Sequence, residues 1–156
     1  MAVHAPLELE RFLPYRLSIL SNRVSQAIAR EYQQRFDLSM TEWRVMAVLA
    51  RYDGEGLSAS EVAAHTEMDK VAVSRALARL VAARRVTRRA HDGDKRRSVL
   101  RLAAAGWKVH DTIAPLARAH EQAMLSELSA DDRRALMRIL DRLAPVGMAT
   151  GMENGE

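Results

Sequence analysis

Apolar side chains recur at helical spacing over most of the chain. Between Pro14 and Phe36 they return every three or four positions, and a proline at the start of this stretch suits the first turn of a helix. The pattern therefore predicts one long helix over 14–36, ended by the sequence 36–38. Its apolar positions are Leu17, Leu20, Val24, Ala27, Ile28 and Tyr32.

Two short helices are predicted next, and both begin with the same signal. Ser39 and Ser58 are each followed three residues later by a glutamate. This is the capping-box pattern, in which the serine and the glutamate each bind a free backbone N–H group of the other. The first helix is predicted to end at the loop 53–56. The second has the inward candidates Val62, Ala63 and Ala64.

A third short helix, predicted from Asp69 to about Ala83, has one apolar and one polar face. Its buried stripe is predicted to be Val73, Ala76, Leu77, Leu80 and Val81. The positions left outside are Lys70, Ser74, Arg75, Ala78 and Arg79.

Two strand-like segments, Val86–Ala90 and Ser98–Leu102, follow this helix and flank a turn that contains Gly93 and aspartates. This composition predicts a β-hairpin. An isolated two-stranded ribbon is only marginally stable in water, so we expect the hairpin to pack on the helices before it.

The C-terminal part returns to helical spacing after Gly106. We expect one helix with a kink at Pro115, and a last helix that Ser129 caps and Pro145 stops. The predicted stripe of the first of these helices is Val109, Ile113, Leu116, His120, Met124 and Leu128, and the last helix carries Leu136, Ile139, Leu140 and Leu143. Residues 1–6 and 147–156 have no such period and are predicted to be flexible tails.

The composition agrees with a helical core and narrows the functional classes. Of the 156 residues 48% are hydrophobic but only 4% are aromatic, and 7 glycines with 4 prolines are too few for a many-stranded barrel. The absence of cysteine excludes disulfides and thiolate metal sites. Without an apolar run of about 18 residues or a secretory leader, we expect a cytoplasmic protein that does not enter a membrane.

Positive charge is concentrated in one segment. Residues 70–101 carry eleven of the 24 basic residues and only two of the 20 acidic residues, although the whole chain has a net charge of +4. A helix and a hairpin that share this excess are typical of a surface that meets nucleic-acid phosphates. The alternative, a solvated basic face without a partner, remains open.

Three helices followed by a basic hairpin are the arrangement of a winged helix-turn-helix. The fold class predicted is thus mainly α with a small β-hairpin wing, flanked by N- and C-terminal helices. The third helix would enter the major groove of double-stranded DNA, where the small residues Ala72 and Ser74 allow close approach. Lys70, Arg75 and Arg79 would reach phosphates or guanine edges, and the sequence does not separate these two roles.

The same residues resemble the MarR-type (multiple-antibiotic-resistance regulator) transcriptional regulators over about 13–143. The wing sequence Asp94-Lys95-Arg96 is similar to the family's Asp-x-Arg signature, and 68–75 and 42–49 are similar to its helix motifs. The resemblance implies that Asp94 orients Arg96, which enters the minor groove. The DNA-binding residues expected together are Lys70, Val71, Ala72, Ser74, Arg75, Arg79, Arg88, Arg89, Asp94, Lys95, Arg96 and Arg97.

Two positions depart from the family pattern. Arg84 stands where the family usually has the glycine that ends the third helix, and Ala103 replaces a threonine before Gly106. Because a left-handed non-glycine residue costs on the order of 1 kcal/mol, we expect this helix to end differently. The loss of the threonine hydroxyl should shift the start of the next helix slightly.

The resemblance also implies a homodimer with interlocked terminal helices. The outer helices carry long apolar stripes but form no compact module of their own, so a second copy is the simplest partner. We expect 38–106 to form the DNA-binding lobe, and 7–37 with 107–146 to form the dimerisation lobe. The dimer would read a pseudo-palindromic operator with half-sites about one helical turn apart.

The family resemblance further implies a small aromatic or anionic effector between the two lobes. Tyr15, Arg16, Asn22 and Trp43 are the candidate ligand-binding residues, since an arginine can pair with an anion and an indole can stack on a ring. Trp43 as a core residue and Arg16 in a surface ion pair remain alternatives.

No catalytic or cofactor site is expected. The five histidines lack a metal-binding spacing, and the aspartate pairs fall in a helix cap and a turn. The leading hypothesis is a ligand-responsive homodimeric DNA-binding regulator, most often a repressor, and not an enzyme. The alternative is a winged-helix architectural or protein-interaction module that binds DNA non-specifically and has no effector.

Overall fold

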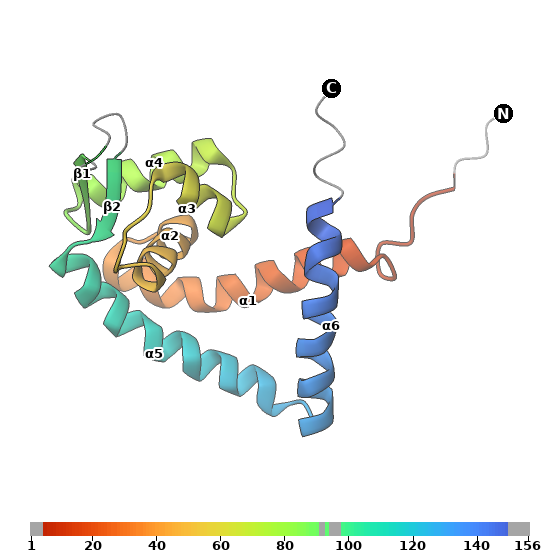
Figure 1. The fold of residues 1–156 in the computed structure, drawn as a ribbon. Coiled ribbons are helices and arrows are strands. Elements are labelled where there is room, and N and C mark those ends of the chain that lie inside the picture. The colour runs from red at the N-terminus through yellow and green to blue at the C-terminus, as the bar shows by residue number, and fades with distance from the viewer. Residues whose placement is uncertain (1–4, 91–92, 94–97, 150–156) are drawn as a thin grey trace. The chain divides into compact units, whose positions relative to one another are not determined.

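The computed structural model describes residues 5–90, residue 93 and residues 98–149, with 145–149 described by their backbone (Figure 1). The chain divides into two units, Met1–Leu116 and Ala117–Glu156. The first unit holds the first four helices, the β-hairpin and most of helix α5. The second unit holds the end of α5 and helix α6.

Helix α1, Leu13–Phe36, matches the predicted long helix and begins one residue earlier. It ends at Asp37, whose left-handed backbone (φ 48°) lets its N–H donate to the carbonyl of Gln33 at 3.1 Å. Its buried residues, Ala29 and Tyr32, lie near the C-terminal end. The N-terminal half of α1 extends away from the other helices of the unit (Figure 1).

Helices α2, Met40–Arg51, and α3, Ala59–Thr66, begin at the two predicted capping boxes. The backbone N–H of Ser39 donates to Glu42 Oε2 at 2.7 Å, and that of Ser58 donates to Glu61 Oε2 at 2.7 Å. Both predictions of a helix start are confirmed. The inward position suggested for Ala64 is wrong, because α3 turns this residue to solvent while Val62 and Ala63 are buried.

Helix α4, Lys70–Ala82, confirms the third short helix. Asp69 caps it by accepting from the N–H of Ala72 at 2.9 Å. Val81 is half-buried, and all five residues predicted to lie outside are exposed. The buried stripe is Val73, Ala76, Leu77 and Leu80, and it packs against α2 and α3.

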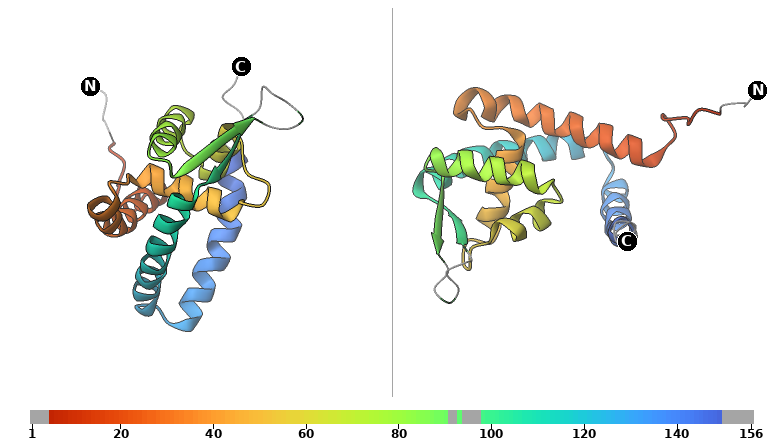
Figure 2. Two further views of the ribbon diagram at one scale, coloured as in Figure 1. Left: turned by 90° about the vertical axis from the view of Figure 1, so that its left-hand side faces the viewer. Right: turned by 90° about the horizontal axis from the view of Figure 1, so that it is seen from above.

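Strands β1, Val86–Ala90, and β2, Ser98–Leu102, form the predicted antiparallel hairpin with the predicted bounds. The hairpin packs on α4 and α2, as expected for a ribbon that is unstable alone (Figure 2). Leu57, before α3, forms a further antiparallel bridge to Leu100, with N–H···O distances of 3.1 and 2.7 Å. This bridge fixes the hairpin to the loop between α2 and α3.

Helix α5, Ala104–Ser126, begins before Gly106, so the expected start after this glycine is wrong. The N–H of Trp107 donates to the carbonyl of Ala103 at 2.9 Å, which places the first turn around Gly106. A Cβ at position 106 would overlap the carbonyl oxygen of Arg85, which explains the glycine. The helix continues through Pro115.

Helix α6, Ala130–Ala149, is capped by Ser129, whose Oγ accepts from the N–H of Asp132 at 3.1 Å. The predicted stop at Pro145 is wrong, because the helix continues to Ala149. A proline removes one backbone donor from a helix but leaves the later N–H groups able to bond, so it need not end the helix. No helix in the described part of the chain is both long and apolar enough to cross a bilayer.

Candidate nucleic-acid interface

The exposed face of α4 carries cations, one small polar residue and one apolar side chain. Lys70, Ser74 and Arg75 are exposed, and Val71 is 55% exposed. Ala72, expected on the outward face, is half-buried beside the cap at Asp69. Because the opposite face of α4 is buried in the core, these exposed side chains are held on a rigid support and are free to meet a ligand.

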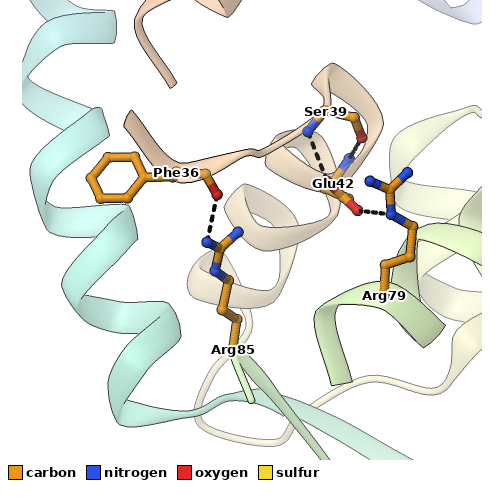
Figure 3. A network of polar contacts seen from close by, with 5 residues as sticks. All are labelled: Phe36, Ser39, Glu42, Arg79 and Arg85. Atoms are coloured by element: carbon orange, nitrogen blue, oxygen red, sulfur yellow. Dashed lines mark hydrogen bonds and ion pairs between the residues drawn. The ribbon is translucent and has the colours of Figure 1, made fainter. Parts of the chain in front are cut away.

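Arg79, on the same helix, has an acidic partner. Its Nε lies 3.0 Å from Oε1 of Glu42 on α2, and the Arg79 side chain is 65% exposed while that of Glu42 is 4% exposed (Figure 3). Sequence reasoning placed Glu42 in the capping box and Arg79 among the DNA contacts, and the structure joins them. The paired charges were visible in the sequence, but their contact depends on how α2 packs against α4.

The end of α4 corrects the expectation for Arg84. Its φ is 57°, so the arginine adopts the left-handed conformation that a glycine would take. The N–H of Arg84 donates to the carbonyl of Val81 at 3.0 Å, and that of Arg85 donates to Leu80 at 2.9 Å. These two bonds form a Schellman motif, so the helix ends as a glycine-terminated helix does.

Arg85 explains why this strained ending persists. Its guanidinium donates to the carbonyl of Phe36, at the end of α1, at 2.6 Å (Figure 3). Its own carbonyl accepts from the N–H of Ala103, before α5, at 2.9 Å. The side chain and the backbone of Arg85 are therefore both held by contacts to other segments, and these contacts fix the position of the neighbouring residue 84. Surrounding structure of this kind can maintain an unfavourable backbone conformation.

The hairpin separates the two adjacent arginines Arg88 and Arg89. The register pairs Arg88 with Leu100 and Arg89 with Val99, so their side chains leave opposite faces of the ribbon. Arg88 therefore lies on the same face of the hairpin as the buried Leu100, although Arg88 itself is exposed. Arg89 lines a cavity of about 570 Å³ together with Glu55, Thr87, Ala90, Val99, Arg101 and Leu102.

Arg101 ties this outer face to the loop before α3. Its guanidinium donates to the carbonyl of Gly54 at 3.0 Å. Gly56, with φ 72°, packs so closely that a Cβ there would overlap Val99 Cγ1. Of the remaining predicted wing residues, Asp94, Lys95, Arg96 and Arg97 lie outside the described residues.

The four candidate ligand-binding residues are not gathered within one chain. Tyr15, Arg16 and Asn22 are exposed on α1. Trp43 is half-buried on α2, with its ring centroid 6.0 Å from that of Tyr32 and 5.8 Å from that of His110. Because Tyr15 precedes Tyr32 by 17 residues, the two lie about 26 Å apart along the helix axis.

Neither the cavities nor the arrangement of possible metal ligands brings the four candidate ligand-binding residues together. A second cavity of about 310 Å³ lies beside the Glu42–Arg79 pair and is lined by Phe36, Asp37, Glu42, Arg79, Leu80, Ala82, Ala83 and Arg85. Neither this cavity nor that of the hairpin includes the four ligand candidates. Within the described ranges, no three His, Asp or Glu side chains are placed to hold a metal ion.

Comparisons with known proteins agree on one family. The model of the MarR family matches residues 36–97. A MarR-family transcriptional regulator from Silicibacter pomeroyi is 26% identical, with a TM-score of 0.72 and coverage of 97% of this chain and 99% of that chain. No curated protein matches the sequence significantly.

Two further solved structures are similar in fold and were determined with bound partners. MepR of Staphylococcus aureus in a DNA complex is 20% identical, with a TM-score of 0.78 and coverage of 88% of this chain and 97% of that chain. The PcaV regulator of Streptomyces coelicolor, in complex with its natural ligand, is 21% identical, with a TM-score of 0.71 and coverage of 92% and 99%.

Proposed function

Because the chain belongs to the MarR family of DNA-binding transcriptional regulators, we propose that it is a homodimeric, sequence-specific repressor that a small aromatic or anionic ligand releases from its operator. The observation that carries this proposal is the α4 face, where Lys70 and Arg75 are exposed on a helix whose opposite face is buried, and the described residues include no acidic partner for either. Its activity is regulation and not catalysis. A transcriptional regulator must be in the same compartment as the DNA it binds, and we propose that this compartment is the cytoplasm.

In this proposal α4 reads the major groove. Lys70 and Arg75 bind phosphates or guanine edges, Ser74 permits close approach, and the exposed Val71 contacts a thymine methyl group. Ala72 lies at the edge of this surface. In the wing, Arg96, oriented by Asp94, enters the minor groove, while Arg88, Arg89, Lys95 and Arg97 bind the backbone.

The dimer is supported by apolar side chains left exposed outside the core. In α1 these include Leu13, Leu17 and Leu20, which are 50%, 42% and 56% exposed. In α6 they are Met137, Ile139, Leu140 and Leu143. We propose that 7–37 and 107–146 form the dimerisation lobe, that 38–106 form the DNA-binding lobe, and that the tails 1–6 and 147–156 take no part.

The effector is supported by the fold shared with PcaV, which was solved with its natural ligand. Trp43 offers a half-buried ring for stacking, and Arg16 offers a cation for an acidic group. Because α1 separates Tyr15 from Trp43 within one chain, a site that holds all four candidates requires α1 of a second subunit. Tyr15 and Asn22 then supply further polar contacts.

The experiment that tests the DNA function is selection of bound sequences from random double-stranded DNA. We expect an enriched pseudo-palindrome, an affinity for it that falls steeply with salt, and loss of this preference in Arg96→Ala. Equal binding to the enriched and the random DNA at matched salt would contradict the proposal. It would leave the chain as an architectural module.

The ligand half of the proposal needs a separate test. Aromatic and small anionic acids that raise the melting temperature of the protein are titrated into the operator complex. We expect at least one of them to lower the affinity for the operator, because a ligand that favours one conformation must shift the equilibrium away from the other. Identical operator affinity with every stabilising compound would refute release by a ligand.

A further inference from the structure

Glu42 uses its two carboxylate oxygens for two different helices. Oε2 accepts from the backbone N–H of Ser39 at 2.7 Å, which completes the cap of α2. Oε1 lies 3.0 Å from Nε of Arg79 on α4 (Figure 3). The residue is only 3% exposed, so the carboxylate connects the start of α2 to the third turn of α4 from a buried position.

Because the Glu42 carboxylate is buried away from water, it needs hydrogen-bonding and oppositely charged partners within the protein. A buried charge is tolerated in a protein when an opposite charge and hydrogen bonds satisfy it. The Ser39 N–H supplies a hydrogen bond and Arg79 supplies the opposite charge. The contact uses Nε, and Glu42 thereby holds the Arg79 guanidinium at the start of α2.

The other cations of α4 are in a different situation. Lys70 and Arg75 are exposed, and the described contacts include no acidic partner for either. Their charge is available to phosphate, whereas the charge of Arg79 is offset by Glu42. The three residues look alike in the sequence, but the structure gives them different surroundings.

From these contacts we propose that Arg79 is a positioning residue for DNA recognition and not a phosphate or base contact. Through Glu42 it fixes the angle of α4 against α2, and this angle decides how Lys70, Ser74 and Arg75 meet the groove. The inference rests on the proposed sequence-specific DNA binding by α4. A second contact lies at the same end of α4, where the guanidinium of Arg85 donates to the carbonyl of Phe36 at 2.6 Å.

The test compares the salt dependence of operator binding for the wild-type chain and three variants. Arg79→Met removes the cation, Glu42→Gln removes the carboxylate charge but retains an acceptor for the cap, and the third variant combines both. Arg75→Met is the matched control, since it is the same substitution one turn earlier on the exposed face. The affinity for the selected operator and for random DNA is measured over a range of KCl concentrations.

If Arg79 positions the helix, Arg79→Met and Glu42→Gln should each lower operator affinity by about tenfold. The double variant should be no weaker than the weaker single variant, because both remove one interaction. Affinity for random DNA should change by less than about twofold, and the salt slope should stay that of the wild type. Arg75→Met should instead reduce the slope by about 0.9 per subunit, the value for one lost phosphate contact.

A direct contact predicts a different set of results. Arg79→Met would then reduce the salt slope as Arg75→Met does, and Glu42→Gln would bind DNA as tightly as the wild type or tighter. Either result overturns the inference. Circular dichroism and thermal melts identify variants that do not fold. If Glu42→Gln is one of these, the slope of Arg79→Met decides alone.

The same variants separate this inference from the proposed function. Wild-type protein that shows no preference for any DNA sequence refutes the proposed function. In that case, thermal unfolding without DNA still tests the tie between α2 and α4. Additive losses of stability in Arg79→Met and Glu42→Gln would show that the two side chains do not interact, and would overturn the inference on its own.

Discussion

Two regions of this molecule use their apolar residues in opposite ways. Every buried hydrophobic residue of the described chain lies between Ala29 and Ile113. By contrast, the N-terminal segment up to Leu20 and the helices after Leu116 leave many large apolar side chains exposed. These are Leu7, Leu9, Phe12, Leu13, Tyr15, Leu17 and Leu20 in the first segment, and Met124, Met137, Ile139, Leu140 and Leu143 in the second.

The difference shows which region has a hydrophobic core of its own. The segment 29–113 encloses its own core, closed by capped helices and by the bridge between Leu57 and Leu100. The outer segments have helical spacing but no covering surface within their own unit. Exposed apolar area of this kind favours association, so in the proposed dimer the outer segments should gain most of their stability from the second copy.

The largest expected effect comes from charging the outer face of α1. Leu17 and Leu20 are 42% and 56% exposed, so the double substitution Leu17→Asp and Leu20→Asp should leave the core of 29–113 intact. It should dissociate the proposed dimer and weaken operator binding by at least about 100-fold, because the second half-site is no longer tethered to the first. Sedimentation and operator titration measure both effects.

Gln26→Asp, at an exposed polar position of the same helix, is the control for this variant. It adds a negative charge without removing apolar area, so it should remain dimeric and bind the operator. A double variant that sediments and binds as the wild type does would break the comparison, because the exposed leucines would then have no partner to lose.

A smaller effect is expected in the loop that holds the hairpin to the core region. Gly56→Ala should lower the free energy of unfolding by about 1–3 kcal/mol, because φ is 72° there and the new Cβ would overlap Val99 Cγ1. Gly54→Ala is the matched control, since among the described residues other than its two chain neighbours no atom lies within 4 Å of a Cβ at that position. Urea denaturation of both variants provides the measurement, and equal stabilities would contradict the explanation.

Arg84→Gly should raise stability, which is unusual for a single substitution. Relief of the left-handed arginine (φ 57°) gains about 1–2 kcal/mol, and the greater freedom of glycine in the unfolded chain offsets about 0.4–1 kcal/mol of this gain. The net increase in the free energy of unfolding should lie between about 0 and 1.6 kcal/mol, with a midpoint of about 0.8 kcal/mol, in urea denaturation. Arg84→Ala removes the same charge but keeps the strain, so it should give no gain.

Local signals explain which parts of this fold could be predicted from sequence. The capping boxes at Ser39 and Ser58 act over three residues, and both helix starts are confirmed. The strands β1 and β2 also have the predicted bounds. In contrast, the ending at Arg84 depends on the side chain of Arg85 reaching Phe36, 49 residues away, so no local pattern could predict it.

The interface shows the same limit. The sequence identified the basic face of α4, and Lys70 and Arg75 are exposed there. It could not separate Arg79 from them, because the packing of α2 on α4 brings Glu42 to this arginine. Helical spacing also could not show whether Tyr15 on α1 and Trp43 on α2 lie close together. It indicates which residues share a face of one helix, but it does not give the distance between residues on different helices.

The smallest effect concerns Tyr32, which lies where α1 joins the core region. Burial raises the pKa of the Tyr32 hydroxyl above its usual 10.0, although the charge of Arg44 partly lowers it. The folded state therefore favours the neutral phenol. This contribution to stability is fully present below pH 10.0 and is lost as the pH rises through the raised pKa of the folded protein.

Tyr32→Phe has no phenol at this position to ionise. Above pH 10.0 the unfolding free energy of the wild type should therefore fall relative to that of the variant. Denaturation series from pH 8 to pH 11 measure the difference, and Tyr52→Phe is the control, at a residue that is 38% exposed. A constant difference over this range would show that Tyr32 ionises as freely in the folded chain as in the unfolded one. That result would contradict the burial of the Tyr32 hydroxyl, on which the placement of the end of α1 in the core region depends.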